Sequence, residues 1–318
     1  PKNRMRPSAW PTAATRNNGF SALYLNAAAS NTVTGCYIQN LAGTAAGLFP
    51  TAHLNTISQS VVVSSAAGYP ALSLSSSDIN TVTGMSIRNI AGRAVELALD
   101  SDFNSISLST MLGSGAPYQA LSISGSVGNS VTASYMQQLA GSAVFLTGGA
   151  NRTTISRSTM VADGVGALGL NINASSSNTV ADCSVENLEG HGLQIFSNAD
   201  FNTVIRSTVN GSASGTNIYG LSVINSSAAK VLDSYVRGST AVHVSGSSGT
   251  VIGGSVLVAA NASANALALV KGGVNLTVTT STLRGGAAGA GLFMDAGNSG
   301  LVTLSSNTVS GGRWGLAI

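Results

Sequence analysis

Residues 80–92 read NTVTGMSIRNIAG, and this stretch decides the fold because it recurs along the chain. The same pattern starts at Asn31 (NTVTGCYIQNLAG), Asn129 (NSVTASYMQQLAG) and Asn178 (NTVADCSVENLEG), so that each start lies 49 residues after the previous one. A second, looser copy lies inside each interval, as in NTISQSVVV from Asn55. The repeating unit is therefore 24 or 25 residues long, and a period in this range is typical of a solenoid.

Two positions of the unit are apolar in every copy. The first series is Val33, Ile57, Val82, Ile106, Val131, Ile155, Val180, Val204, Val231, Val251, Val278 and Leu304. The second, five residues further on, is Ile38, Val62, Ile87, Met111, Met136, Met160, Val185, Val209, Val236, Val256, Leu283 and Val309. An alternating apolar pair such as Leu72 and Leu74 follows in each unit, and alternation with a period of two indicates a strand. We expect three short strands per coil, with both series stacked as core ladders.

A single unit cannot be stable alone. About five buried aliphatic side chains contribute roughly 1.5 to 3 kcal/mol each, whereas ordering the backbone of each residue costs on the order of 1 to 2 kcal/mol. Stacked coils share backbone hydrogen bonds and enclose a continuous core. The energetics therefore favour an all-β solenoid.

Charged residues are scarce. They make up 8% of the 318 residues, against roughly 25% in a typical soluble domain, while 44% are hydrophobic. With a net charge of +3 and a mean hydropathy of +0.30, the chain is neither a coiled coil nor disordered. No sustained basic face is present, and no apolar run reaches the roughly 18 to 20 residues of a membrane span. We expect neither nucleic-acid binding nor a membrane span.

The pattern N-T-V-x-x-x-x-I followed by G-x-x-x-L-x-L resembles the right-handed parallel β-helix repeats of the pectate-lyase-like superfamily, in particular its non-catalytic surface and structural type. The resemblance implies a three-faced prism of about twelve coils of 24–25 residues. We expect residues 21–318 to form this single domain, uncapped at its C-terminus, and residues 1–20 to be a basic leader or linker. Marker spacings after Val204 are 27, 20, 27 and 26, so loop lengths change there.

The sixth position of the unit is small and mostly hydroxylic. We expect its side chains to bond the backbone of the neighbouring coil at a bend. Cys36 and Cys183 occupy this column six coils apart, about 29 Å at sheet spacing, which predicts two free thiols.

Outward positions carry a repeated T-x-T, as in Thr32/Thr34 and Thr81/Thr83, which leaves ice or another ordered surface as a binding alternative. Good strand propensity explains the same residues. Tyr37, Tyr135 and Tyr235 recur four coils apart at another outward position, so no contiguous aromatic groove is expected.

Catalytic signals are weak. Gly190-His191-Gly192 resembles the G-H-G element of polygalacturonases, but the accompanying elements are absent and the repeat accounts for the glycines. Asp182, Glu186 and Glu189 share a coil without partners in neighbouring coils, whereas glycoside hydrolysis requires two carboxylates roughly 5 to 9.5 Å apart. We expect no enzyme, with a polysaccharide lyase, hydrolase or epimerase as the alternative.

Two further groups of residues are candidate sites. Asp78, Asp100 and Asp102 precede unit starts in adjacent coils, where their oxygens suit Ca²⁺, although a solvated loop without any cofactor is favoured. Six N-x-S/T sequons are candidate glycosylation sites in a eukaryotic secreted protein: Asn151, Asn173, Asn210, Asn225, Asn261 and Asn275.

The ends of the rod suggest assembly. Leu23 and Leu25 form a strand pair in the first coil, and Leu316 and Ile318 close the last coil without a cap. Head-to-tail stacking of such ends builds a filament. The sequence thus favours a non-catalytic structural β-solenoid outside the cell or on its surface, in a filament, stalk or adhesin. Its main partner would be itself, end to end, with surface proteins or glycans as further partners. A glycan- or ice-binding module is the remaining alternative.

Overall fold

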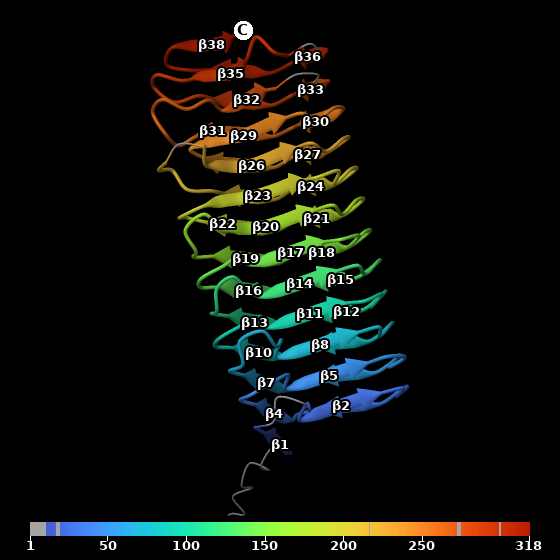
Figure 1. Cartoon of the computed structure of the whole chain (residues 1–318). Coiled ribbons are helices and arrows are strands. Elements are labelled where there is room, and N and C mark those ends of the chain that lie inside the picture. The colour runs from blue at the N-terminus through green and yellow to red at the C-terminus, as the bar shows by residue number, and fades with distance from the viewer. Residues whose placement is uncertain (1–10, 17–19, 216, 272–274, 299) are drawn as a thin grey trace, which may run out of the picture.

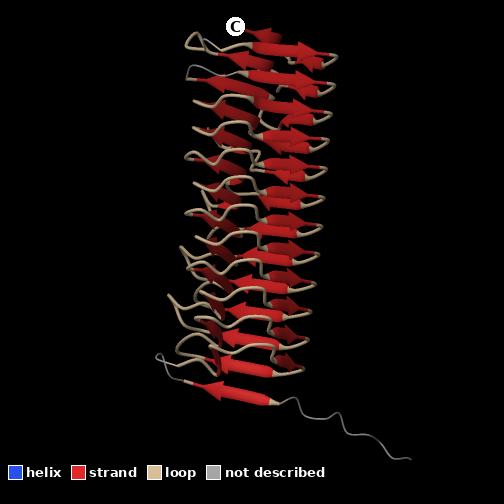
Figure 2. Ribbon diagram, turned by 90° about the vertical axis from the view of Figure 1, so that its right-hand side faces the viewer, coloured by secondary structure: helices blue, strands red, loops and turns tan. Residues whose placement is uncertain are grey.

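The computed structural model describes residues 11–16, 20–215, 217–271, 275–298 and 300–318. These residues form a single rod of stacked coils built from strands and loops (Figure 1). A view turned by 90° shows the strands of successive coils lying above one another (Figure 2). Within the described residues there is no helix, and so none that is long and apolar enough to cross a membrane.

Every coil contributes strands to three parallel sheets that run the length of the rod. In the described residues, sheets A, B and C hold 13, 13 and 12 strands. Sheet A consists of β1 (Thr12–Thr15), β4 (Tyr37–Asn40), β7 (Val61–Ser64), β10 (Ser86–Asn89), β13 (Thr110–Gly113), β16 (Tyr135–Gln138), β19 (Thr159–Ala162), β22 (Ser184–Asn187), β25 (Thr208–Asn210), β28 (Tyr235–Gly238), β31 (Val256–Ala259), β34 (Thr282–Arg284) and β37 (Thr308–Ser310).

Sheet B consists of β2 (Leu23–Asn26), β5 (Ala46–Phe49), β8 (Leu72–Ser75), β11 (Val95–Ala98), β14 (Leu121–Ser124), β17 (Val144–Thr147), β20 (Leu168–Asn173), β23 (His191–Phe196), β26 (Tyr219–Ile224), β29 (Thr240–Ser245), β32 (Leu267–Val270), β35 (Ala290–Met294) and β38 (Trp314–Ala317). Sheet C consists of β3 (Thr32–Thr34), β6 (Thr56–Ser58), β9 (Thr81–Thr83), β12 (Ser105–Ser107), β15 (Ser130–Thr132), β18 (Thr154–Ser156), β21 (Thr179–Ala181), β24 (Thr203–Ile205), β27 (Lys230–Leu232), β30 (Thr250–Gly253), β33 (Leu276–Thr279) and β36 (Val302–Ser305).

The two apolar series form continuous columns in the core. Ile57 pairs in register with Val82 in sheet C, and Ile87 pairs with Met111 in sheet A; all four side chains are fully buried. Val33, in the first coil, is only partly buried. The predicted all-β solenoid of about twelve coils is therefore the observed architecture.

The predicted register is wrong by one residue late in the chain. Val231 pairs with Ile252, not Val251, and Val236 pairs with Leu257, not Val256. Ile252 and Leu257 are fully buried, whereas Val251 and Val256 point outward and are partly exposed. The connection between β28 and β29 is a single residue, Ser239, so this coil is shorter than the preceding one and Ile252 takes the inward position. A shift of one residue reverses the face of every side chain.

The predicted start of the domain at residue 21 is too late. Strand β1 already pairs with β4, from Thr12 opposite Tyr37 to Thr15 opposite Asn40. Its half-buried residues are Ala13 and Thr15, whose small side chains do not show the aliphatic marker of the repeat. Lys2, Arg4 and Arg6 of the predicted basic leader lie outside the described residues.

Buried polar ladders join successive coils. In the serine column, the backbone N–H of Ser109 donates to Ser134 Oγ at 3.2 Å, and Ser134 N–H donates to Ser158 Oγ at 3.1 Å. This is the predicted bond from a small side chain to the next coil. In the asparagine column, Asn80 Oδ1 accepts bonds from both the backbone N–H and Nδ2 of Asn55. These bonds pair groups that would otherwise be buried without partners.

A third ladder explains why the repeat is double. Asn89 Nδ2 donates to the carbonyl oxygens of Ala66 and Tyr69, and so holds the longer loop of the preceding coil. Asn187 does the same for Gly164 and Ala167. These amide side chains occur in every second coil, so the 49-residue period corresponds to a pair of coils, one with the amide and one with the longer loop that it holds.

Candidate functional site

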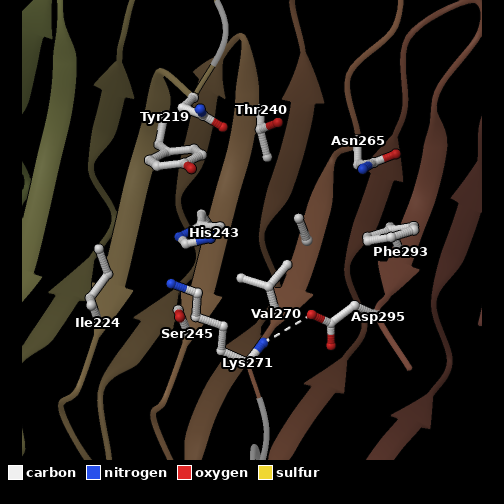
Figure 3. Close-up of a pocket in the computed structure, with 12 residues that line it drawn as sticks. Tyr219, Ile224, Thr240, His243, Ser245, Asn265, Val270, Lys271, Phe293 and Asp295 are labelled. Atoms are coloured by element: carbon white, nitrogen blue, oxygen red, sulfur yellow. Dashed lines mark hydrogen bonds between the residues drawn. The ribbon is translucent and has the colours of Figure 1, made fainter. Parts of the chain in front are cut away.

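A hollow in the described part of the rod lies on the outward face of sheet B, over β26, β29, β32 and β35. Its volume is about 700 Å³, and it is open to solvent (Figure 3). Its described lining residues are Asn217, Tyr219, Ile224, Thr240, His243, Ser245, Asn265, Ala268, Val270, Lys271, Phe293 and Asp295. We call this hollow the C-terminal groove.

Two stacked rings form one wall of the C-terminal groove. The Tyr219 and His243 rings are nearly parallel, with centroids 4.2 Å apart and an interplanar angle of 8°. On the other side of Tyr219, the His191 ring lies 5.4 Å away at 36°. Phe293 lines the groove two strands beyond His243, in the same register column through Ala268. The groove is thus bordered by aromatic rings.

Glycine packing brings Tyr219 to this position. Strands β23 and β26 have six residues, where most strands of sheet B have four, and the extra residues place His191 and Tyr219 at their starts. The extension requires close approach of the chain behind the sheet. A Cβ on Gly192 would collide with the carbonyl oxygen of Gly220, so only glycine fits there.

Burial sets the charge states of the rings. It lowers the pKa of His243 to about 4, with smaller contributions from the charges of Lys271 and His191. Burial also raises the pKa of the Tyr219 phenol. Near neutral pH, the groove therefore offers a neutral imidazole and a protonated phenol.

The charged groups of the groove have different surroundings. The Asp295 carboxylate accepts hydrogen bonds from the backbone N–H of Lys271 at 3.0 Å and of Gly297 at 3.3 Å, and from Asn298 Nδ2 at 3.1 Å. The exposed Lys271 extends its side chain toward His243 (Figure 3). Asp295 thus holds the groove wall in place, and the Lys271 side chain lies beside the His243 ring (Figure 3).

The groove offers aromatic rings for stacking and polar groups for hydrogen bonding. Among the described lining residues, Asp295 supplies the one carboxylate, and its oxygens are occupied. The paired carboxylates needed for glycoside hydrolysis are not brought together. Aromatic faces beside amide and hydroxyl groups suit a ligand with both apolar faces and polar edges.

His191, the histidine of the G-H-G sequence, has a structural contact. Its Nδ1 accepts a hydrogen bond from the backbone N–H of Tyr219 at 3.2 Å, and burial lowers its pKa. It is the first residue of strand β23. The ring supports the position of Tyr219.

The other predicted carboxylates are dispersed. Asp182 forms an ion pair with Arg206 of the next coil on an exposed turn. Glu186 lies on β22 of sheet A, and Glu189 follows that strand. None of the three lines the C-terminal groove.

The aspartates considered for calcium bond the backbone. Asp78 Oδ1 accepts the N–H of Asp102 at 2.8 Å, and Asp102 Oδ1 accepts the N–H of Val127 at 2.7 Å. Asp100 is an exposed turn residue with a φ of 60°. Among the described residues, no group of three or more His, Cys, Asp or Glu side chains is placed to hold a metal ion.

The outward hydroxyls of sheet C bond one another. Ser107 Oγ donates to Thr83 Oγ1 at 2.9 Å, and Thr132 Oγ1 and Ser156 Oγ are hydrogen-bonded at 3.2 Å.

Cys36 and Cys183 are free thiols, as predicted, and burial raises the pKa of the Cys183 thiol.

The predicted sequon asparagines do not share one exposure. Asn225 and Asn275 are exposed. The remaining four are partly exposed: Asn151, Asn173, Asn210 and Asn261. Asn151 also accepts the backbone N–H of Ser176, so its amide takes part in a coil-to-coil contact.

Three of the predicted assembly residues, Leu23, Leu25 and Leu316, lie on the two edge strands of sheet B, and Ile318 follows the second of these strands. Leu23 and Leu25 on β2 are partly buried against the core. Leu316 on β38 is 47% exposed, and Ile318 is 88% exposed.

Sequence reasoning missed the C-terminal groove. The available signal was the irregular spacing after Val204, because changed loop lengths in a regular repeat are where binding residues are found. The column of Tyr37, Tyr135 and Tyr235 does not line this groove. Tyr219, His243 and Phe293 line it, although they do not all share one repeat position. They come together through an extended strand and sheet register.

A family model described as "Right handed beta helix region" matches residues 70–236, which is more than half of the chain. The chain belongs to this right-handed β-helix family. A search of curated proteins finds no match to the sequence.

Solved structures share the fold at low sequence identity. The A-module of mannuronan C-5 epimerase AlgE6 from Azotobacter vinelandii has a TM-score of 0.62 and 11% identity, covering 94% of this chain and 89% of that one. DFA-IIIase from Arthrobacter chlorophenolicus A6 has a TM-score of 0.59 and 10% identity, covering 88% of each chain. The Dettilon tailspike protein has a TM-score of 0.53 and 12% identity, covering 89% of this chain and 62% of the tailspike. At these identities the likeness shows the fold alone.

Proposed function

We propose that this chain is a carbohydrate-binding β-helix that holds a glycan in the C-terminal groove. The observation that carries the proposal is the Tyr219–His243 stack, with Phe293 in line and Asn265, Thr240 and Lys271 around it. Aromatic faces pack against the apolar faces of sugar rings, while amide, hydroxyl and ammonium groups bond sugar hydroxyls. The β-helix fold shared with an epimerase, DFA-IIIase and a tailspike is consistent with this proposal.

We further propose binding without turnover, outside the cell or on its surface. The single carboxylate of the described groove lining, Asp295, supports the first part, because glycoside hydrolysis uses two carboxyl groups on either side of the bond that breaks. An assay for new reducing ends or unsaturated products, run with every glycan that binds, tests it. Product formation that is lost in His243→Gln would show an enzyme.

The direct test is a panel of neutral and acidic oligosaccharides, including mannuronan and dextran fragments, followed by calorimetry. We expect Phe293→Ala to weaken binding at least about tenfold, as expected for the loss of a stacking contact of ~1.4 kcal/mol. Tyr219→Ala should also weaken binding, because the Tyr219 ring lies between His191 and His243 and holds the His243 ring in place. Tyr235→Ala is the matched control, because Tyr235 is an exposed tyrosine on β28 of sheet A. Binding that ignores Tyr219 and Phe293, or no binding across the panel, would contradict the proposal.

End-to-end stacking is a second candidate function. It is favoured by Trp314 and Leu316 on the edge strand β38, which are 48% and 47% exposed. Sedimentation at increasing concentration tests it. Association that disappears in Leu316→Asp and persists in the exposed-surface control Leu108→Asp supports stacking; a monomer at all concentrations overturns it.

A further inference from the structure

A second aromatic hollow lies at the other end of sheet B. The Tyr24 and Phe49 rings stand 4.8 Å apart at 30°, and Tyr69 lines the same hollow of about 300 Å³. We call it the N-terminal hollow. Tyr24 is 55% exposed and Tyr69 is 42% exposed, so both rings present open faces. Ser73 and Glu96 supply polar groups at its edge.

The two hollows face the same way. Tyr24 and His243 occupy one outward register column of sheet B, nine strand spacings apart, or about 43 Å at ~4.8 Å per strand. Strands β2 and β29 lie on the same side of the rod in Figure 1. The column between Tyr24 and His243 runs through Gly47, Ser73, Glu96, Ser122, Phe145, Asn171, Gln194 and Ser222.

The path between the hollows suits a flexible polar polymer. One carboxylate, Glu96, lies in this column, and it is paired with Arg93. The other residues of the column are Gly47, amides and serines, of which Ser73, Ser122 and Ser222 are buried, with Phe145 as an aromatic ring part of the way along. A linear glycan can therefore follow the sheet without crossing an unpaired charge in the column.

We infer that one linear glycan chain binds both hollows at once and runs along the axis of the rod. This inference rests on the proposed glycan binding at the C-terminal groove and adds the N-terminal hollow as a second contact. Once the glycan is held at one hollow, its contact with the second hollow forms within the same complex. The high effective concentration of the glycan at the second hollow raises the overall affinity, provided that the glycan spans the distance between the two hollows.

The test is the dependence of affinity on glycan length. Size-fractionated mannuronan and dextran, from disaccharides to long polymers, are titrated against the whole chain. For the polymer that binds, we expect the dissociation constant, expressed per glycan molecule, to fall roughly 10²-fold once the glycan is long enough to span both hollows. Shorter fragments should bind the C-terminal groove with a constant that does not change with length.

Substitutions separate the two contacts. Tyr24→Ala and Phe49→Ala should remove the gain seen with long chains and leave the binding of short fragments to the C-terminal groove unchanged. Tyr37→Ala, on β4 of sheet A in the neighbouring coil, is the matched control and should change neither. Equal affinity at all lengths, or long-chain binding insensitive to Tyr24 and Phe49, overturns the inference while the proposed function stands. Absence of binding to every glycan overturns both.

Discussion

The Arg206 guanidinium holds the Asp182 carboxylate of the preceding coil at two points, with Nε to Oδ1 at 2.7 Å and Nη2 to Oδ2 at 2.9 Å. The hydrogen bond from Arg206 is the largest cause of the lowered pKa of Asp182, and Arg157 adds to it. Asp233 adds to the raised pKa of Arg206. Arg157, Asp182, Arg206 and Asp233 thus form a row of alternating charge on successive turns.

This exposed ion pair should contribute little to stability. Water and salt screen it, and exposed pairs of this kind are weak. Since the folded pKa of Asp182 is lowered, its contribution is full above the usual value of 3.8 and is lost as the pH falls below it. A double-mutant cycle with Asp182→Asn and Arg206→Gln should give a small coupling at low salt that vanishes at high salt. Coupling that survives high salt would contradict this assignment.

The core ladders should resist truncation strongly. Met136 is fully buried and pairs with Met111 and Met160 in sheet A. Met136→Ala should lower the free energy of unfolding by about 2 to 5 kcal/mol, because it removes buried contacts and leaves a cavity. Met136→Leu keeps most of the volume and should cost less than about 1.5 kcal/mol. Denaturant titration measures both; equal effects would argue against a tightly packed ladder.

One substitution should stabilise the protein. Thr153 interrupts the asparagine column between Asn129 and Asn178, and both Asn129 Nδ2 and Thr153 Oγ1 are buried without a partner in the described structure. Thr153→Asn places an amide oxygen where Asn129 can donate to it, as Asn55 donates to Asn80. We expect a gain of about 1 kcal/mol in the free energy of unfolding.

The reverse change supplies the control. Asn80→Thr should destabilise the protein, since it removes acceptors and donors from an intact part of the same column. If both substitutions shift the unfolding midpoint in the same direction, the ladder does not explain the stability.

Acid should weaken the fold through His243. Its pKa is about 4 in the folded chain against an ordinary 6.5, so the unfolded chain binds more protons between these values. The free energy of unfolding should therefore fall as the pH drops from 6.5 toward 4, and be independent of this group above 6.5. His243→Gln should make this part of the profile less steep, and His191, whose pKa is also lowered by burial, accounts for part of the slope that remains.

The control for the pH profile is His53→Gln, because His53 is an exposed residue far along the chain from the groove. Its profile should follow that of the unmodified protein. A profile for His243→Gln that falls as steeply as before would show that other groups determine the acid sensitivity.

The sequence predicted those features that repeat. Apolar residues recur at the positions of Val82 and Ile87 because every coil must place an apolar side chain in the core there. The C-terminal groove depends on coils whose connections differ in length from those of the regular repeat. The positions of its side chains follow from these lengths and are not indicated by residue type. The pairing of Val231 with Ile252 shows how a shorter turn changes the register. The contact of Tyr219 with His243 joins different repeat positions on adjacent strands, so no period in the sequence indicates it.

The loop-holding amides Asn40, Asn89, Gln138 and Asn187 also set the increment by which such a rod changes length. Duplicating or deleting a segment of 49 residues keeps each amide beside the loop it supports. A single inserted coil would leave a loop without its amide or an amide without its loop. Growth in pairs of coils, about 10 Å at a time, is thus the route by which a gene could lengthen this molecule and leave its internal bonding intact.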